Sequence, residues 1–206
     1  MDKSAHNPMQ KIRLVSAVRQ ATRQMPEGWP GAWFLTDPQR VPDPVSLVST
    51  LPPGTGMIYR HFGTADRLET ARRLRKACSR TGIPLLIAND PALAMLVGAD
   101  GVHWPEACAG HARKWQRRFL YQTQSAHSPA SLRQSVCDAV LLSTAFPSNS
   151  PSAGQAMGAV RFRSQALKTE KIVYALGGVN GATAGSVSGV SGLAAIEGFL
   201  PLRFSR

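Results

Sequence analysis

The sequence contains no apolar segment of the roughly 18 residues that a membrane-spanning helix needs. Its N-terminus is polar and lacks the apolar core of a secretory signal. Cysteine is scarce and widely spaced, at Cys78, Cys108 and Cys137, which indicates neither a disulfide framework nor a CxxC metal site. These absences predict a protein of the reducing cytoplasm without a membrane span.

Acidic residues are also few, with 12 Asp and Glu against 24 Lys and Arg, for a formal net charge of +12. This excess raises the hypothesis of nucleic-acid binding, which would show a steep dependence on salt. Nine of the basic residues lie on or near two expected helices, within residues 72–80 and 113–118, where they favour solvated outer faces over a docking stripe. The distribution therefore argues against nucleic acid and favours small phosphorylated molecules as partners.

The chain has 206 residues, of which 43% are hydrophobic, enough to bury one substantial core. Residues 1–24 read as a basic amphipathic helix whose narrow apolar stripe contains Leu14, Ala17, Val18 and Ala21. Such a helix could lie on a membrane surface, but the narrow stripe favours docking on the same protein. We expect residues 1–30 to form an N-terminal basic helical extension and residues 31–206 to form the main domain.

Short apolar runs, each suited to a buried parallel strand, alternate with helical patterns through the rest of the chain. The expected strands are residues 32–35, 56–60, 83–87, 101–104, 119–123, 139–142, 172–176 and 192–196. Eight such units predict a single (β/α)₈ (TIM) barrel. The runner-up is an open doubly wound sheet, although no GxGxxG motif follows an early strand.

The stretch from Ile83 to Glu106 packs two of these strands and a helix into a short unit. Asn89-Asp90 ends the first strand, Pro91 suits the first turn of a helix, and Gly98 ends that helix. Asn89 and Asp90 are therefore either functional groups at a strand end or a helix cap.

Other helices are less regular. One is expected over residues 65–79, with Leu68, Ala71, Leu74 and Ala77 facing inward. The segment 181–192 is made wholly of Gly, Ala, Ser, Thr and Val, so a helix there would be weak and that side of the barrel mobile. Only ten residues follow Ile196, which predicts a shortened C-terminal end whose flank the N-terminal helix covers.

Six short motifs occur in one order and spacing: LTDP (35–38), YR (59–60), IAND (87–90), GADGVH (98–103), SAH (125–127) and ALGGV (175–179). Together they resemble the thiamine phosphate synthase/TenI family, whose members are (β/α)₈ barrels. The resemblance covers roughly residues 33–198 and implies an enzyme of thiamine biosynthesis. Its synthases join a pyrimidine diphosphate to a thiazole phosphate, with Mg²⁺ holding the leaving diphosphate.

The resemblance also implies roles for individual residues. It assigns diphosphate or substrate contacts to strand-end side chains and the thiazole phosphate to a glycine turn, the usual barrel phosphate position. The implied substrate-binding residues are Arg60, Asn89, Ser125, Gly177 and Gly178, and Asp90 would contact both substrate and metal. The family tautomerases have an acid/base histidine where His127 stands, although Ser-Ala-His also occurs in the synthases.

Several positions depart from the family pattern, and three of these changes, at Phe62, Cys108 and Pro151, remove charge from the expected diphosphate site. Ile58 and Phe62 replace a Gln and a Lys, and Cys108 replaces a second metal-binding Asp, for which Glu106 could substitute. In the loop after the sixth strand Ser148 and Ser150 keep the hydroxyl groups. Pro151 replaces a cation there, and Glu197 stands where a small hydroxyl residue helps to bind phosphate.

Three functions remain open. The first is thiamine phosphate synthesis, a transferase reaction, at a degenerate diphosphate and Mg²⁺ site formed by Asp90 and Glu106. The second is tautomerisation of a phosphorylated thiazole by His127, which needs only a phosphate anchor and an acid/base group. The third is a non-catalytic barrel that binds a thiamine precursor or acts as a regulatory partner. The sequence leaves open whether the chain forms a homo-oligomer.

Overall fold

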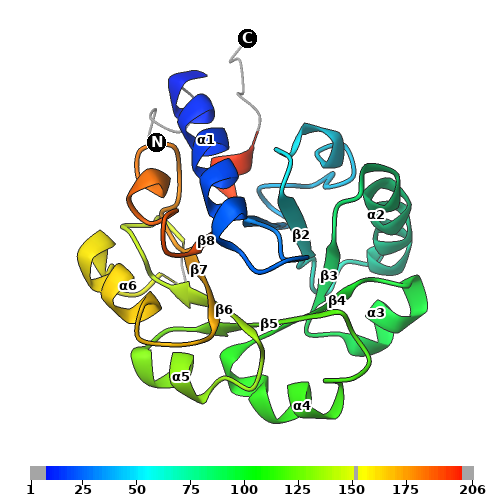
Figure 1. Cartoon of the computed structure of the whole chain (residues 1–206). Helices are drawn as coiled ribbons and strands as arrows, with labels where there is room; N and C mark the ends of the chain where they lie inside the picture. The colour runs from blue at the N-terminus through cyan, green and yellow to red at the C-terminus, as the bar shows by residue number, and fades with distance from the viewer. Residues whose placement is uncertain (1–7, 151–152, 201–206) are drawn as a thin grey trace.

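Strand β1 (Ala32–Leu35) begins a closed barrel of eight parallel strands in a computed structural model that describes residues 8–150 and 153–200. The other strands are β2 (Thr55–Tyr59), β3 (Leu85–Ala88), β4 (Gly101–Trp104), β5 (Tyr121–Ala126), β6 (Ala139–Ser143), β7 (Ile172–Leu176) and β8 (Gly192–Ala195). Pairing of β1 with β8 in parallel closes the barrel (Figure 1). The predicted (β/α)₈ barrel is confirmed, and the open-sheet alternative is excluded.

Helices surround this barrel (Figure 1). The α-helices are α1 (Pro8–Gln24), α2 (Arg67–Thr81), α3 (Pro91–Val97), α4 (Ala109–Lys114), α5 (Pro129–Gln134) and α6 (Gly158–Ala166). The 3₁₀ helices are η2 (Val48–Thr50), η3 (Glu106–Cys108), η4 (Ala184–Ser186) and η5 (Glu197–Phe199). Within the described residues no helix combines the length and hydropathy of a membrane span.

The strands carry side chains alternately into the barrel and toward the helices, as the two-residue period of a strand requires. Trp33, Ile58, Leu86 and Tyr174 belong to a cluster inside the barrel. Small residues make room for the large rings, because a Cβ at Gly56 would collide with the Trp33 ring. The barrel interior is therefore a packed core, and chemistry is confined to its ends.

The loop between α1 and β1 closes the N-terminal end of the barrel. The Tyr174 hydroxyl donates to the Pro30 carbonyl at 2.7 Å, and the Tyr121 hydroxyl donates to the Gly28 carbonyl at 2.5 Å. Two tyrosines of the interior therefore anchor this loop across the barrel floor. The opposite end, where the strands finish, stays available for a site.

Helix α1 packs on β8 and η4, as the sequence predicts for the uncovered flank (Figure 1). Its Leu14, Ala17, Val18 and Ala21 are buried in the same core cluster as the outer faces of the strands. The Gln20 side chain accepts a hydrogen bond from Ser188 at 2.8 Å. Residues 1–7 of the expected helix lie outside the described residues.

Some expected boundaries are wrong. Strands β3 and β5 each begin two residues later than predicted, because Ile83 and Phe119 lie in the preceding loops. Leu68, expected inward on α2, is 37% exposed, whereas Thr70 and Cys78 are buried. The only helix in segment 181–192 is the three-residue η4. The low helix propensity of this segment is consistent with the absence of a full α-helix there.

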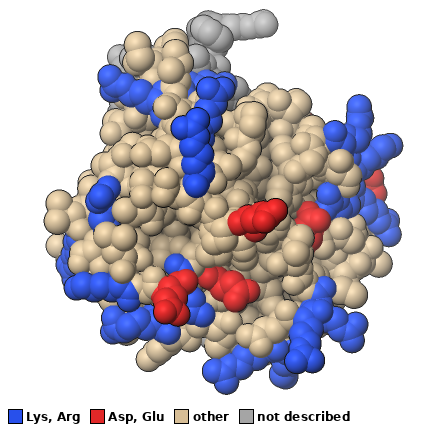
Figure 2. All heavy atoms as spheres, viewed as in Figure 1, with Lys and Arg blue, Asp and Glu red and all other residues tan. Residues whose placement is uncertain are grey.

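Charged side chains are spread over the face of the molecule drawn in Figure 2. Figure 2 shows Lys and Arg side chains mainly around the periphery of the face in view, with acidic side chains closer to its centre. On this face the basic residues do not gather into one continuous stripe. That nucleic acid is not a partner stays a prediction.

Candidate active site

The site residues predicted from the sequence lie in the last residues of strands or in the loops that follow them, and the structure brings them to the C-terminal end of the barrel. They lie at the ends of β2 (Arg60), β3 (Asn89 and Asp90), β4 (Glu106), β5 (Ser125 and His127), β6 (Ser148 and Ser150) and β7 (Gly177 and Gly178). This end of the barrel is the candidate active site, and the role of each residue stays a prediction.

Arg60 supplies a cation at this end. It directly follows β2, and its backbone N–H donates to the Thr36 hydroxyl at 2.9 Å, which ties β2 to the end of β1. Burial lowers the pKa of the Arg60 guanidinium, although nearby Asp37 opposes the shift. Within the described residues the guanidinium has no ion-pair partner, so it can meet an anionic ligand.

His103 makes two buried polar contacts beside Ser125, although no site role was predicted for this residue of the GADGVH motif. It is 5% exposed and lies between Thr123 (Nδ1 to Oγ1, 2.8 Å) and Ser125 (Nε2 to Oγ, 3.0 Å). Burial, and then the charge of Arg60, lower the pKa of His103 to about 3. His103 therefore stays neutral and orients the Ser125 hydroxyl. The sequence could have indicated these contacts, because neighbouring residues of a strand face opposite sides. Trp104 on β4 faces outward, so His103 must face the inside of the barrel.

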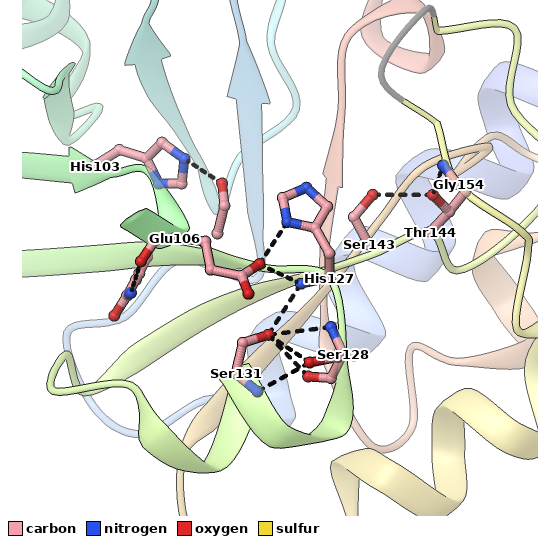
Figure 3. A network of polar contacts seen from close by, with 10 residues as sticks. His103, Glu106, His127, Ser128, Ser131, Ser143, Thr144 and Gly154 are labelled. Carbon is pink, nitrogen blue, oxygen red and sulfur yellow. Dashed lines mark hydrogen bonds and ion pairs between the residues drawn. The ribbon is translucent and has the colours of Figure 1, made fainter. Parts of the chain in front are cut away.

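His127 and Glu106 form a close pair. Figure 3 shows the imidazole and the carboxylate pointing toward one another. The distance from His127 Nδ1 to Glu106 Oε2 is 2.6 Å. The same oxygen accepts the His127 backbone N–H at 2.9 Å. Although burial alone would raise the pKa of Glu106, hydrogen bonds from His127 and Ser131 lower it below its ordinary value. The ionised carboxylate thus holds a proton on Nδ1 and leaves Nε2 as the basic nitrogen.

Helix α5 fixes the position of His127. Ser128 caps the helix by accepting the Ser131 backbone N–H at 3.0 Å, and Pro129 occupies the first turn as predicted. The Ser131 hydroxyl in turn accepts the backbone N–H groups of His127 (3.2 Å) and Ser128 (3.1 Å). This reciprocal capping box sets the backbone immediately before the helix. His127 is therefore held by its main chain as well as by its ring.

Asp90 is both a helix cap and half of an ion pair. Its Oδ1 accepts the Leu93 backbone N–H at 2.9 Å, and its Oδ2 lies 2.7 Å from Nη1 of Arg67. Asn89, beside it, has a left-handed backbone (φ 51°) and an exposed side chain, and its N–H donates to the His103 carbonyl at 2.8 Å. The sequence left a cap and a site role open for Asp90; the cap is present, and the site role stays a prediction.

These contacts decide whether Asp90 and Glu106 are available as ligands for the Mg²⁺ that the family resemblance implies. Asp90 already has a donor on each oxygen, and Glu106 is engaged by His127. Among the described residues, no three His, Cys, Asp or Glu side chains come together as a metal site would need. The donor set therefore does not fit a metal ion as the side chains stand.

The ends of β6 and β7 form the other side of the site. Ser143 and Thr144, which the sequence reasoning missed, place two hydroxyl groups 3.3 Å apart, and Thr144 accepts the Gly154 N–H at 3.1 Å (Figure 3). Ser148 accepts the Ser150 backbone N–H at 3.3 Å, so these two predicted residues share one loop. Pro151 lies outside the described residues.

Gly177 and Gly178 form the turn after β7, with φ values of 94° and 64° that favour glycine. A Cβ at Gly178 would collide with the Pro147 carbonyl oxygen. The backbone N–H groups of both glycines make no hydrogen bond to another described residue. Consecutive free N–H groups in such a turn can receive a phosphate.

Glu197, at the start of η5, pairs with Arg40, its Oε1 3.6 Å from Nε. The two side chains are 56% and 26% exposed. A carboxylate beside a bound phosphate would repel it. The ion pair offsets that charge in part.

Comparison with known proteins identifies the family. Residues 47–199 match the family model TMP-TENI, described as thiamine monophosphate synthase. The thiamine-phosphate synthase of Lysinibacillus sphaericus (strain C3-41) is 31% identical over 153 residues, which cover 69% of this chain and 67% of that protein. The thiamine-phosphate synthase of Azoarcus sp. (strain BH72) is 57% identical over 61 residues, only 28% of this chain and 30% of the relative.

A solved structure agrees with the fold. The thiamine phosphate pyrophosphorylase from Pyrococcus furiosus superposes with a TM-score of 0.66 at 21% identity, covering 84% of this chain and 89% of that one. At this identity the likeness shows the barrel alone. The match over residues 47–199 and the Lysinibacillus relative go further, and by them the chain belongs to the thiamine monophosphate synthase family.

Proposed function

We propose that the barrel binds a phosphorylated thiazole in thiamine biosynthesis and moves a proton on it, with His127 as the acid/base group. The observation that carries this proposal is the 2.6 Å contact between His127 Nδ1 and Glu106 Oε2. A carboxylate on one ring nitrogen stabilises the imidazolium that forms when the other nitrogen takes a proton. His127 Nε2 would remove a proton from the thiazole and return it at another atom.

The phosphate would be received by the turn at Gly177 and Gly178, whose N–H groups are free within the described residues. The unpaired guanidinium of Arg60 would supply positive charge at the mouth of the barrel. Ser125, oriented by His103, would donate or accept a hydrogen bond at the ring. The glycine turn would thus bind the phosphate, Arg60 would supply positive charge, and His127 would carry the proton. No step requires a metal ion.

A second candidate is the condensation that forms thiamine phosphate. The curated relatives are named thiamine-phosphate synthases, which favours this transferase reaction. It requires a pyrimidine diphosphate as second substrate and charge to stabilise the departing diphosphate. Arg60 is available for that role, whereas Asp90 and Glu106 are engaged elsewhere. The same binding site would serve both reactions.

The test follows the thiazole phosphate by NMR from its less stable tautomer to the aromatic ring. We expect wild-type turnover and a loss of roughly 10²-fold or more in His127→Asn, with binding of thiazole phosphate retained. His111→Asn, at an exposed histidine of α4, is the matched control and should leave the rate unchanged. No tautomerisation by wild-type protein would overturn the proposal.

A parallel incubation with pyrimidine diphosphate, scored for thiamine phosphate, separates the alternatives. Product formation would establish the synthase reaction. Binding of thiazole phosphate without either reaction would leave a non-catalytic precursor-binding barrel. Failure to bind thiazole phosphate would contradict all three functions: tautomerase, synthase and precursor-binding protein.

A further inference from the structure

The guanidinium of Arg67 lies on the carboxylate of Asp90. Arg67 is the first residue of α2, and its Nη1 lies 2.7 Å from Asp90 Oδ2. Its Nη2 donates to the Ala88 carbonyl, the last of β3, at 3.1 Å. One side chain therefore links the start of α2 to the end of β3 and to the acidic residue that follows it.

The contact with Arg67 occupies Oδ2, the Asp90 oxygen that a metal ion would need as a ligand. Oδ1 caps α3 through the Leu93 N–H, and Oδ2 faces the guanidinium. The side chains of Arg67 and Asp90 are only 20% and 29% exposed, so solvent screens the pair incompletely. A divalent cation at Oδ2 would have to displace Arg67 or lie beside its positive charge.

Phe62 supports this arrangement. Its ring centroid lies 5.4 Å from Cζ of Arg67, within the range of a cation–π contact. Phe62 occupies the position where the family resemblance implies a lysine. The positive charge missing at residue 62 is thus present at residue 67, where it faces Asp90 and rests near the aromatic ring.

We propose that Arg67 takes the place of the metal ion at Asp90, as a positioning residue, so that the barrel binds its anionic ligand without Mg²⁺. Arg67 neutralises Asp90 and holds the turn after β3, and Arg60 remains to contact the anion. This inference rests on the proposed function only in placing an anion at this end of the barrel. Its central claim concerns a divalent cation and needs no turnover.

The test is a titration of the full chain with Mn²⁺ alone, followed by electron paramagnetic resonance of the free ion. We expect wild type to bind Mn²⁺ no more tightly than Asp90→Asn. Arg67→Gln frees Asp90 Oδ2 and should bind Mn²⁺ about tenfold more tightly or better, because the nearby positive charge is gone. Adding Asp90→Asn to Arg67→Gln should abolish this gain.

Arg75→Gln is the matched control, because Arg75 is on the same helix and pairs with Asp100 at 2.6 Å. Asp100 precedes β4 at the opposite end of the barrel, so this change should not create a Mn²⁺ site in the candidate active site. Tight Mn²⁺ binding by wild type that is lost in Asp90→Asn would overturn the proposal. Circular dichroism of each variant verifies that it is folded.

A second measurement uses only the wild-type protein, so it does not depend on any variant folding. Calorimetric titration with inorganic phosphate should give the same affinity in EDTA and in excess Mg²⁺. An affinity about tenfold higher with Mg²⁺ would overturn the inference. If phosphate does not bind under either condition, the proposed function fails at its anchor, while the Mn²⁺ titration still decides the role of Arg67.

Discussion

His103 Nε2 and the Ser125 hydroxyl are hydrogen-bonded at 3.0 Å between the neighbouring strands β4 and β5. The other ring nitrogen contacts Thr123, so the imidazole is fixed at both ends inside the barrel. The predicted substrate contact Ser125 is therefore oriented before any ligand binds. The ring in this network is neutral, because burial and the charge of Arg60 disfavour the charged form.

This network predicts a pH dependence of stability. The pKa of His103 is about 3 in the folded chain, against 6.5 for the ordinary side chain. Between these values the unfolded chain binds the extra proton, so the free energy of unfolding should fall as pH drops below about 6.5. One group contributes at most about 1.4 kcal/mol per pH unit.

Urea unfolding of wild type and His103→Asn between pH 4 and 7 measures this contribution. We expect the variant to be less stable at pH 7 but to lose stability less steeply on acidification. Parallel pH profiles for the two proteins would contradict the prediction.

The glycine turn after β7 should tolerate no side chain. In Gly178→Ala the new side chain is strained by the left-handed backbone and also collides with the Pro147 carbonyl oxygen. Gly98→Ala is the control, since Gly98 has φ 66° but open space where a Cβ would lie. We expect a loss of roughly 1–2 kcal/mol for Gly98→Ala and a larger loss for Gly178→Ala, measured by urea unfolding. Equal losses would mean that the turn relaxes away from Pro147.

The three cysteines should differ in reactivity. Burial raises the pKa of both Cys78 and Cys137 to about 12, so neither forms much thiolate near neutral pH. Cys108, at the start of α4, is only partly buried. We expect iodoacetamide at pH 8 to add one label to the folded protein, at Cys108, and three after denaturation. Mass spectrometry of wild type and Cys108→Ser checks this, and labelling of Cys78 in the folded chain would contradict it.

Helix α1 should contribute to the stability of the barrel. Leu14 is 2% exposed, whereas Ile12 on the same helix is 63% exposed. Leu14→Ala should lower the free energy of unfolding by about 2–5 kcal/mol, because it leaves a cavity against the barrel. Ile12→Ala should change it by about 0.5 kcal/mol or less. Chemical denaturation of both variants decides whether α1 is part of the cooperative core, and similar effects would contradict the prediction.

The sequence predicts most strands well because they are short apolar runs bounded by turn residues, whereas β5 contains Gln122, Thr123, Gln124 and Ser125. The bounds of β1, β4 and β7 are those expected from Ala32, Gly101 and Ile172 onward. The inward face of α2 is predicted less well. A stripe of residues every three positions, starting at Leu68, drifts around a helix of 3.6 residues per turn. The buried positions Ala71, Leu74 and Cys78 follow the true period.

The sequence also places the site residues at one end of the barrel, because each lies at the end of a strand or in the loop after it. It cannot show which of them pair. Asp90 meets Arg67 across 23 residues and Glu106 meets His127 across 21, contacts that depend on the packing of different βα units. The hydroxyl groups of Ser143 and Thr144 were missed because β6 extends beyond its apolar run.

The packing of α1 against β8 has a consequence for biosynthesis. The ribosome completes α1 long before it reaches residues 192–195, which form β8. Until then Leu14, Val18 and their neighbours lack the surface that buries them in the finished protein. The last strand therefore both joins β1 and covers α1, so the nascent chain exposes the apolar face of α1 throughout most of its synthesis. During that time α1 is a segment that chaperones would have to shield from aggregation.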